Sequence, residues 1–145
     1  MAISRQNLRE HLISVLYIAG VRDDLSFAEV LKNYCEEHDP KLLRDQFFQS
    51  TAKNINEQQE KLDKIIKKYM QNWNFERNPL LDRCILRLGC YELLSSDTPP
   101  NVALAEAVRL ANRFCADDSH SYINGILASI NKKEQRFSDA PQCDE

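Results

Sequence analysis

The chain has 145 residues, a length that suits one domain and leaves no room for a second. Its 43% hydrophobic and 28% charged residues are typical of a globular protein with a real core. No window approaches the roughly 18 apolar residues of a membrane span, and the net charge of −3 excludes the strongly basic balance of a dedicated nucleic-acid binder.

The charge is uneven along the chain. Residues 22–45 hold four Lys or Arg against seven Asp or Glu, and residues 139–145 add three acids and no base. The remaining 15 basic and 12 acidic residues make the rest of the chain mildly positive. Because local patches attract RNA more than the total charge does, the net charge does not decide whether the protein binds RNA.

Helical spacing of apolar residues predicts four helices in the N-terminal half. The first covers residues 4–19. Ser26 and Glu29 are spaced as a capping box at the start of the second, which we expect to end near residues 38–40. A third helix is predicted over residues 41–53. The fourth follows a cap at Asn54 or Asn56, and its lysines are expected to form a solvated face.

Three more helices are predicted in the C-terminal half. The fifth runs from Pro79, after an Asn78 cap, to about Ser95, and it is apolar around most of its circumference. Such a helix must be surrounded by others, so we expect it to be central. Breaks at residues 97–100 and 117–119 start the sixth and seventh helices. The glycine of Asn124-Gly125 inside the seventh is interpreted as a site of close helix packing.

These elements predict an all-α protein, a compact bundle of about seven helices over residues 1–134. After residue 134 the periodicity is lost, and we expect residues 135–145 to be a polar, disordered tail whose removal leaves a stable fragment.

The cysteines and histidines do not predict a metal site or an enzyme. The five cysteines have no zinc spacing, and their odd number without a signal peptide indicates reduced thiols in a cytoplasmic protein. Those in apolar segments, Cys84, Cys90 and Cys115, are interpreted as small core residues. The three histidines lie on separate elements, and no nucleophile motif or phosphate-binding glycine loop is present. We therefore expect no cofactor and no catalysis.

Several segments resemble the NusB family. Residues 81–94, LDRCILRLGCYELL, resemble the family pattern in which an acidic residue precedes ILRLAxYEL. Residues 99–111 resemble IPxxVAINEAVELA, and residues 118–127 resemble DSxxFVNGVL. At the other end, residues 8–17 resemble ARExALQALY. The blocks occur in family order and leave only residues 20–70 without a matching motif.

This resemblance implies a fold of two three-helix subdomains with one additional helix. It also implies a function in transcription antitermination. NusB proteins bind a single-stranded boxA-type RNA element together with NusE, a small-subunit ribosomal protein, and help to keep RNA polymerase processive, notably on ribosomal RNA operons. The expected partners are therefore boxA-type RNA, NusE and the RNA polymerase antitermination complex.

The resemblance places RNA at the N-terminus and at the start of the last helix. Arg5 and Arg9 stand four apart on one helical face, away from the apolar stripe, where they can bind neighbouring phosphates. The family often has consecutive basic residues there, whereas this chain has Gln6 and Asn7, so we expect weaker intrinsic RNA binding. Tyr17 is a candidate at the edge of the same surface.

In the C-terminal half, Tyr122 matches the family's aromatic position. It is expected either to stack on a base or to be buried beside its apolar neighbours. Asp118 is expected either to accept from a base or to cap the seventh helix. Asp82, Arg83 and Arg87 are candidates for RNA or partner contact, with ion pairing to neighbouring helices as the alternative for the two arginines.

The sparse arginine motif leaves a second hypothesis open. The chain then keeps the same fold as a protein-only scaffold that has lost RNA binding. Titrating RNA at two salt concentrations separates the two hypotheses, because phosphate binding weakens steeply with salt and apolar docking does not. The sequence does not distinguish a monomer from a homodimer.

Overall fold

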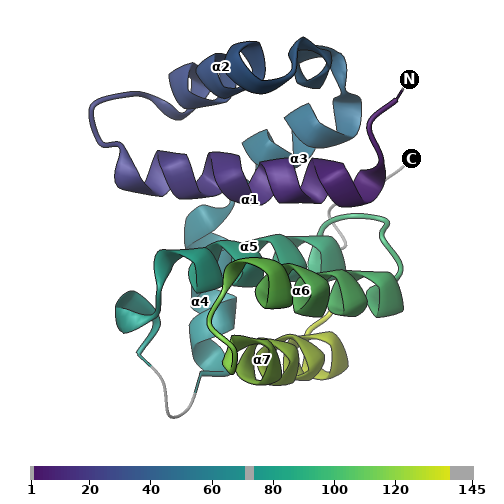
Figure 1. Cartoon of the computed structure of the whole chain (residues 1–145). Coiled ribbons are helices and arrows are strands. Elements are labelled where there is room, and N and C mark those ends of the chain that lie inside the picture. The colour runs from purple at the N-terminus through teal and green to yellow at the C-terminus, as the bar shows by residue number, and fades with distance from the viewer. Residues whose placement is uncertain (1, 71–73, 138–145) are drawn as a thin grey trace. The chain divides into compact units, whose positions relative to one another are not determined.

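The computed structural model describes residues 2–70 and 74–137. Over these residues the chain forms seven α-helices and two 3-10 helices, with no strand among them (Figure 1). The predicted all-α fold with about seven helices is confirmed. The chain divides into two compact units, Met1–Gln59 and Glu60–Glu145, called the N-terminal and C-terminal units. Each is described by itself.

The N-terminal unit contains α1 (Arg5–Val21), α2 (Phe27–His38) and α3 (Gln46–Glu57), with the 3-10 helix η1 (Pro40–Arg44) before α3. Helix α1 packs against both α2 and α3. The capping box at Ser26 and Glu29 is confirmed, since each side chain accepts the other residue's backbone N–H. The core of this unit is apolar and fully buried, and includes Leu12, Ile13 and Phe48.

The prediction for residues 41–56 is wrong in its boundaries. The expected third helix is divided into η1 and α3, because the Asp45 side chain accepts the Phe48 N–H at 2.8 Å and starts a new helix there. Asn54 and Asn56 lie inside α3 and do not cap a fourth helix. Helix α4 (Gln59–Lys68) begins directly after the end of α3. The Asp45 cap therefore divides a segment that the sequence predicts as one helix.

The C-terminal unit contains most of α4, then η2 (Phe75–Arg77), α5 (Leu80–Leu94), α6 (Pro100–Phe114) and α7 (Ser119–Lys133). Helices α5, α6 and α7 all pack against one another. Twelve of the fifteen residues of α5 are buried, which confirms the expected buried helix. Three helices in one unit and four in the other agree with two three-helix subdomains and an additional helix.

The start of α5 differs from the prediction by one residue. Pro79 occupies the N-cap position, where its side chain makes no capping hydrogen bond, and Leu80 is the first helical residue. Asn78 instead ends η2, and its carbonyl accepts a hydrogen bond from Arg83 Nε at 3.1 Å.

The chain after α7 returns to the end of α5. The Phe137 N–H donates to the Leu94 carbonyl at 2.8 Å, and Arg136 donates to the Ser96 and Thr98 carbonyls. Lys61 Nζ lies 3.6 Å from the centre of the Phe137 ring. From residue 138 onward, the expected tail lies outside the described residues.

The two glycines of α5 and α7 have opposite surroundings. A Cβ on Gly89 would lie 2.6 Å from Cδ1 of Leu127, a fully buried residue, so the Leu127 side chain would have to shift inside the core to admit it. A Cβ on Gly125 would meet nothing within 4 Å. The interpretation of Gly125 as a close-packing residue is wrong, because the close approach occurs at Gly89.

This difference predicts opposite effects of two alanine substitutions. Gly125→Ala should stabilise the protein by about 0.5–1 kcal/mol through helix propensity and a less flexible unfolded chain. Gly89→Ala gains the same propensity but overpacks the core at a cost of roughly 1–3 kcal/mol, so it should destabilise. Urea unfolding midpoints measure both effects. Equal stabilisation by the two substitutions would contradict the packing at Gly89.

Candidate nucleic-acid interface

Arg5 and Arg9 both lie over the ring of Phe47. The guanidinium carbons are 3.9 Å and 5.7 Å from the ring centre, which confirms that the two arginines share a helical face. Arg5 is exposed, whereas Arg9 is only 3% exposed. The expectation that both arginines point away from the apolar stripe is therefore wrong for Arg9. Of these two arginines, Arg5 is the one that presents its charge to solvent.

Phe47 is the residue of this group that sequence reasoning missed. It lies in the first turn of α3 and is half-buried. Its ring holds the Arg5 guanidinium by a cation–π contact, which is typically worth about 0.5–1 kcal/mol at an exposed site. The sequence signal was the Asp45 cap, since a helix starting at Gln46 places Phe47 next to it. Tyr17, 40% exposed, lies twelve residues along α1 from Arg5, a rise of about 18 Å, so the structure does not bring the two together.

Tyr122 is anchored by a buried carboxylate. Its hydroxyl donates to Asp82 Oδ2, and Ser119 Oγ donates to the same oxygen at 3.0 Å. Asp82 is 2% exposed, while the Tyr122 ring is half-buried. Burial and the Asp82 carboxylate raise the pKa of Tyr122, so the phenol stays neutral. The structure therefore gives Tyr122 both a fixed hydroxyl and a partly exposed ring.

Asp118 occupies the N-cap position of α7 but does not cap the helix. Its side chain accepts no capping hydrogen bond, and it is exposed. The capping interpretation is wrong, and the carboxylate is exposed beside the same turn that carries Ser119.

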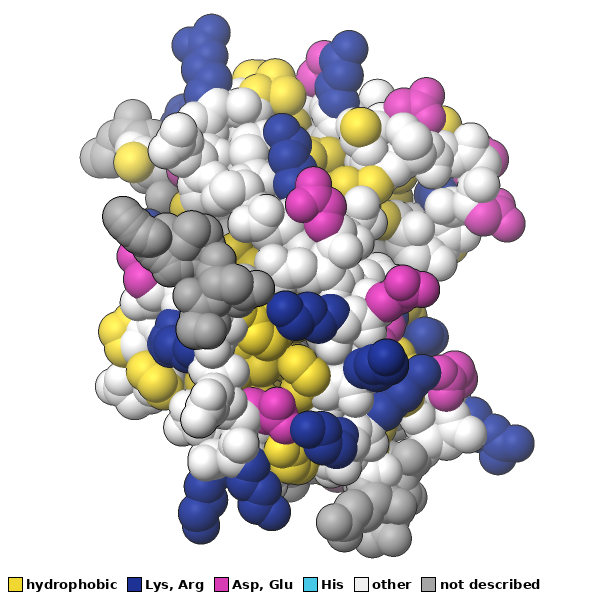
Figure 2. Space-filling view, turned by 180° about the vertical axis from the view of Figure 1, so that it is seen from behind, with side chains coloured by type: hydrophobic (Ala, Val, Ile, Leu, Met, Phe, Trp, Pro, Cys, Tyr) yellow, Lys and Arg dark blue, Asp and Glu magenta, His cyan; other side chains and the backbone are white. Residues whose placement is uncertain are grey.

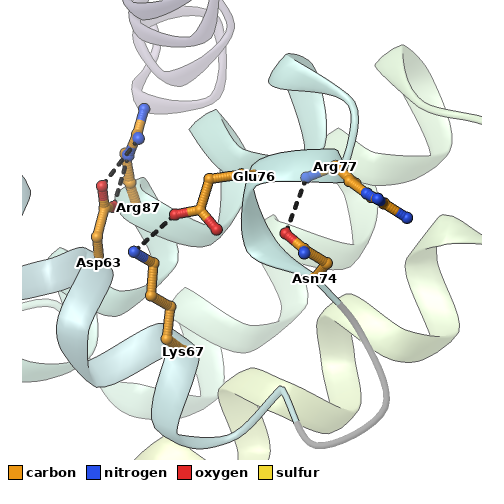
Figure 3. A network of polar contacts seen from close by, with 6 residues as sticks. All are labelled: Asp63, Lys67, Asn74, Glu76, Arg77 and Arg87. Carbon is orange, nitrogen blue, oxygen red and sulfur yellow. Dashed lines mark hydrogen bonds and ion pairs between the residues drawn. The ribbon is translucent and has the colours of Figure 1, made fainter.

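Arg87 joins α5 to α4 (Figure 3). Its Nε and a terminal nitrogen donate to the two oxygens of Asp63 at 2.7 Å and 2.9 Å, and both side chains are largely buried. The ion-pair interpretation is confirmed for Arg87. Arg83 differs, because it is half-buried and donates to the Asn78 carbonyl.

Cations surround the buried ring of Phe75, which lies between α4 and α5 in the sequence. Lys67 Nζ and the guanidinium carbons of Arg83 and Arg87 lie 5.4, 5.8 and 5.4 Å from its centre. Lys67 also pairs with Glu76 at 2.7 Å (Figure 3), and that contact lowers the pKa of Glu76. Several of the charged side chains around α4 therefore contact other side chains of the same unit.

The remaining lysines of α4 are exposed, as predicted for a solvated face. Lys68 pairs with Glu134 at 2.7 Å, and Lys61 contacts the Phe137 ring. Figure 2 shows Lys and Arg side chains gathered on one face of the C-terminal unit. Residues 60–137 hold 12 Lys or Arg against 10 Asp or Glu, so the described part of this unit is the more basic one.

His11 and His38 come together although they belong to different helices. His11 Nδ1 lies 2.8 Å from the Tyr34 hydroxyl, and the His38 ring stacks on the Tyr34 ring with centres 4.0 Å apart. Burial and the His38 charge lower the pKa of His11. The described residues nevertheless contain no group of three or more His, Cys, Asp or Glu that could hold a metal ion.

The four cysteines that the structure describes are buried or partly buried, and burial raises the pKa of each thiol. Burial raises the pKa of Cys84 to about 11 and of Cys90 to about 12, which confirms both as core residues. Cys115 is only partly buried, and burial together with Asp82 raises its pKa. Within residues 2–70 and 74–137, no helix is long and apolar enough to cross a membrane.

These features define an all-helical protein with charged and aromatic side chains on its surface. The model of the NusB family matches residues 6–132. The transcription antitermination protein NusB of Thermobifida fusca is 33% identical over 136 residues, which is 93% of this chain and 94% of that protein. The chain belongs to the NusB family.

Solved structures agree with this assignment. A crystal form of T. maritima NusB superimposes with a TM-score of 0.83 at 29% identity, covering 97% of this chain and 98% of that one. A crystal structure of the antitermination factors NusB and NusE in complex with double-stranded RNA gives a TM-score of 0.74 at 25% identity. It covers 88% of this chain and 96% of that one.

Proposed function

We propose that this protein is a transcription antitermination factor that binds RNA together with a NusE-type ribosomal protein. In this role it keeps RNA polymerase processive, notably on ribosomal RNA operons, and it acts in the cytoplasm without catalysing a reaction. The observation that carries the proposal is the match of nearly the whole chain to NusB proteins, one of them solved with NusE and RNA.

Within this proposal the site residues have two kinds of role. Arg5 and Asp118 are exposed, and the Tyr122 ring is partly so, so these three are proposed to touch RNA. Arg9 and Asp82 are 3% and 2% exposed, and we assign them to positioning Phe47 and Tyr122. The exposed Tyr17 and the half-buried Arg83 remain candidates for RNA or partner contact, whereas Arg87 is engaged with Asp63.

Two substitutions are expected to separate phosphate binding from stacking. Arg5→Ala should reduce the slope of log affinity against log salt by about 0.7, the effect of one phosphate contact on single-stranded RNA. Tyr122→Ala should weaken binding by about 1–3 kcal/mol and leave the slope unchanged, because stacking releases no counterions. Tyr122→Phe keeps the ring and removes the hydrogen bond to Asp82. Its RNA affinity shows how much this hydrogen bond contributes to RNA binding. RNA titrations at several salt concentrations measure all three.

Arg22→Ala is the matched control for Arg5→Ala. Arg22 is an exposed arginine that follows the other end of α1, where it pairs with Asp24. Its loss should leave the salt slope as in the wild type. If the slope of log RNA affinity against log salt is the same for Arg5→Ala and Arg22→Ala, Arg5 is not part of the RNA site.

The function is tested by titrating RNA and a NusE-type protein around all four sides of the binding cycle. Each ligand should tighten the other by the same factor, typically about 1–3 kcal/mol of coupling. Both single-stranded boxA-type RNA and a duplex should be used, since the solved NusB–NusE relative holds double-stranded RNA. The two forms then show which one this protein prefers.

The competing function is a protein-only scaffold. It is favoured by the sparse N-terminal arginines and by the burial of Arg9. If the partner binds but RNA does not bind in its presence or its absence, the scaffold hypothesis is correct. If neither ligand binds, the chain keeps the family fold without the proposed function.

A further inference from the structure

We propose that a second phosphate of the RNA strand binds in the η1 hollow, an open depression lined by Ala2, Ile3, Lys41, Arg44 and Asp45. The depression has a volume of about 200 Å³. This inference rests on the proposed RNA-binding function and adds a site to it. The two cations come from a segment that carries no family motif in the sequence.

The 3-10 geometry of η1 places its two cations on one side. A 3-10 helix has three residues per turn, so side chains at positions i and i+3 eclipse each other. Lys41 and Arg44 have this spacing within η1, and both are exposed. An arginine and a lysine side by side provide the forked and the point-like donors that commonly bind phosphate oxygens.

Two short segments of the chain connect the η1 hollow with Arg5 and with the Phe47 ring that contacts it. Ile3 lines the hollow, and Arg5 follows two residues later at the start of α1. Asp45 also lines the hollow, and Phe47 follows two residues later with its ring 3.9 Å from the Arg5 guanidinium carbon. Two residues span at most about 7 Å, so neighbouring phosphates of one strand can reach both places.

The negative charges beside the hollow are engaged in capping. Asp45 Oδ1 accepts the Phe48 N–H at 2.8 Å, and Asp39 Oδ1 accepts the Lys41 N–H at 3.0 Å. The α3 N-terminus balances part of the Asp45 charge. Because Lys41 and Arg44 line the hollow with this one carboxylate, the local balance of charge favours an anion.

This site explains how a chain with Gln6 and Asn7 at its N-terminus can still bind RNA. Phosphate affinity scales with the number of phosphates that Lys and Arg side chains neutralise, wherever in the sequence those side chains lie. In this protein η1 supplies two such side chains, Lys41 and Arg44, in addition to Arg5. The hollow is open, so a free phosphate should bind far more weakly than a strand already held at Arg5.

The test compares the double variant Lys41→Gln/Arg44→Gln with the control Lys32→Gln/Lys53→Gln. Both pairs remove two exposed charges from the N-terminal unit, and the control pair lies on α2 and α3 outside the hollow. RNA affinity is measured against salt with a NusE-type protein present. The hollow variant should lose about 0.7 in slope, the effect of one neutralised phosphate on a single strand, and the control should keep the wild-type slope.

A second measurement locates the phosphate on the RNA. Single phosphates are replaced in turn by neutral methylphosphonates, and each RNA is titrated against the wild type and the hollow variant. One position should weaken binding to the wild type and have no effect on the hollow variant, while Arg5→Ala should lose its sensitivity at a neighbouring position. Circular dichroism and unfolding midpoints confirm that each variant folds.

The possible outcomes separate this inference from the function on which it rests. If the wild type does not bind RNA even with the partner, the proposed function fails and the site fails with it. If the wild type binds and Arg5→Ala lowers the slope, but the hollow variant behaves like the control, the function stands and the η1 hollow is not a phosphate site.

Discussion

Leu88→Ala is expected to lower the free energy of unfolding by about 2–5 kcal/mol. Leu88 is 1% exposed in the middle of α5, the most buried helix of the C-terminal unit. Removing its branched side chain loses the burial of several carbons and leaves a cavity that the packed helices fill only in part. Urea unfolding followed by circular dichroism measures the loss as a lower midpoint at unchanged slope.

Val102→Ala is the control for this prediction. Val102 is 37% exposed near the start of α6, so its truncation should change the stability by less than about 0.5 kcal/mol. If Leu88→Ala unfolds at the wild-type midpoint, α5 is not the packed centre of its unit.

Arg87→Met is expected to destabilise the protein by about 3 kcal/mol. The substitution keeps most of the apolar stem but leaves the Asp63 carboxylate largely buried without its bidentate partner. An uncompensated charge of this kind is far more costly than the net gain from making the pair. The effect should change little with salt, because solvent ions screen a buried pair weakly.

A double-mutant cycle isolates this ion pair from other effects. Asp63→Leu alone should also destabilise, since it leaves the Arg87 guanidinium unpaired. The double variant Arg87→Met/Asp63→Leu should recover most of the lost stability, because two apolar side chains can pack where the pair was. Additive losses in the double variant would mean that the two side chains do not depend on each other.

The sequence was sufficient where the signal is local or repeated. The apolar circumference of α5 predicts a buried helix, and the spacing of Ser26 and Glu29 predicts a capping box. In both cases the residues that form the sequence pattern are the ones that produce the structure. The prediction failed where two local signals compete. Asp45 lies inside the predicted third helix, and its capping hydrogen bond divides that helix in two.

Contacts between residues far apart in the sequence could not be predicted from local sequence patterns. Asp63 and Arg87 are 24 residues apart, and Asp82 and Tyr122 are 40 apart, so no helical period relates them. The same reason explains why the sequence pattern predicts Arg9 at the surface and Gly125 as the packing glycine, both of which are wrong. Helical position tells which residues share a face, but only the neighbouring helices decide whether that face is covered.

The return of the chain to α5 after residue 134 bears on how this protein should be handled. A tag, a linker or a protease site introduced after Lys133 would separate Phe137 from the Leu94 carbonyl and Arg136 from the Ser96 and Thr98 carbonyls. The three residues that supply these carbonyls end α5 and lead into α6, so an enzyme that digests inward from the C-terminus should slow at residue 137. Fusions joined beyond Phe137 keep this closure, and those joined before it leave the end of the buried helix uncovered.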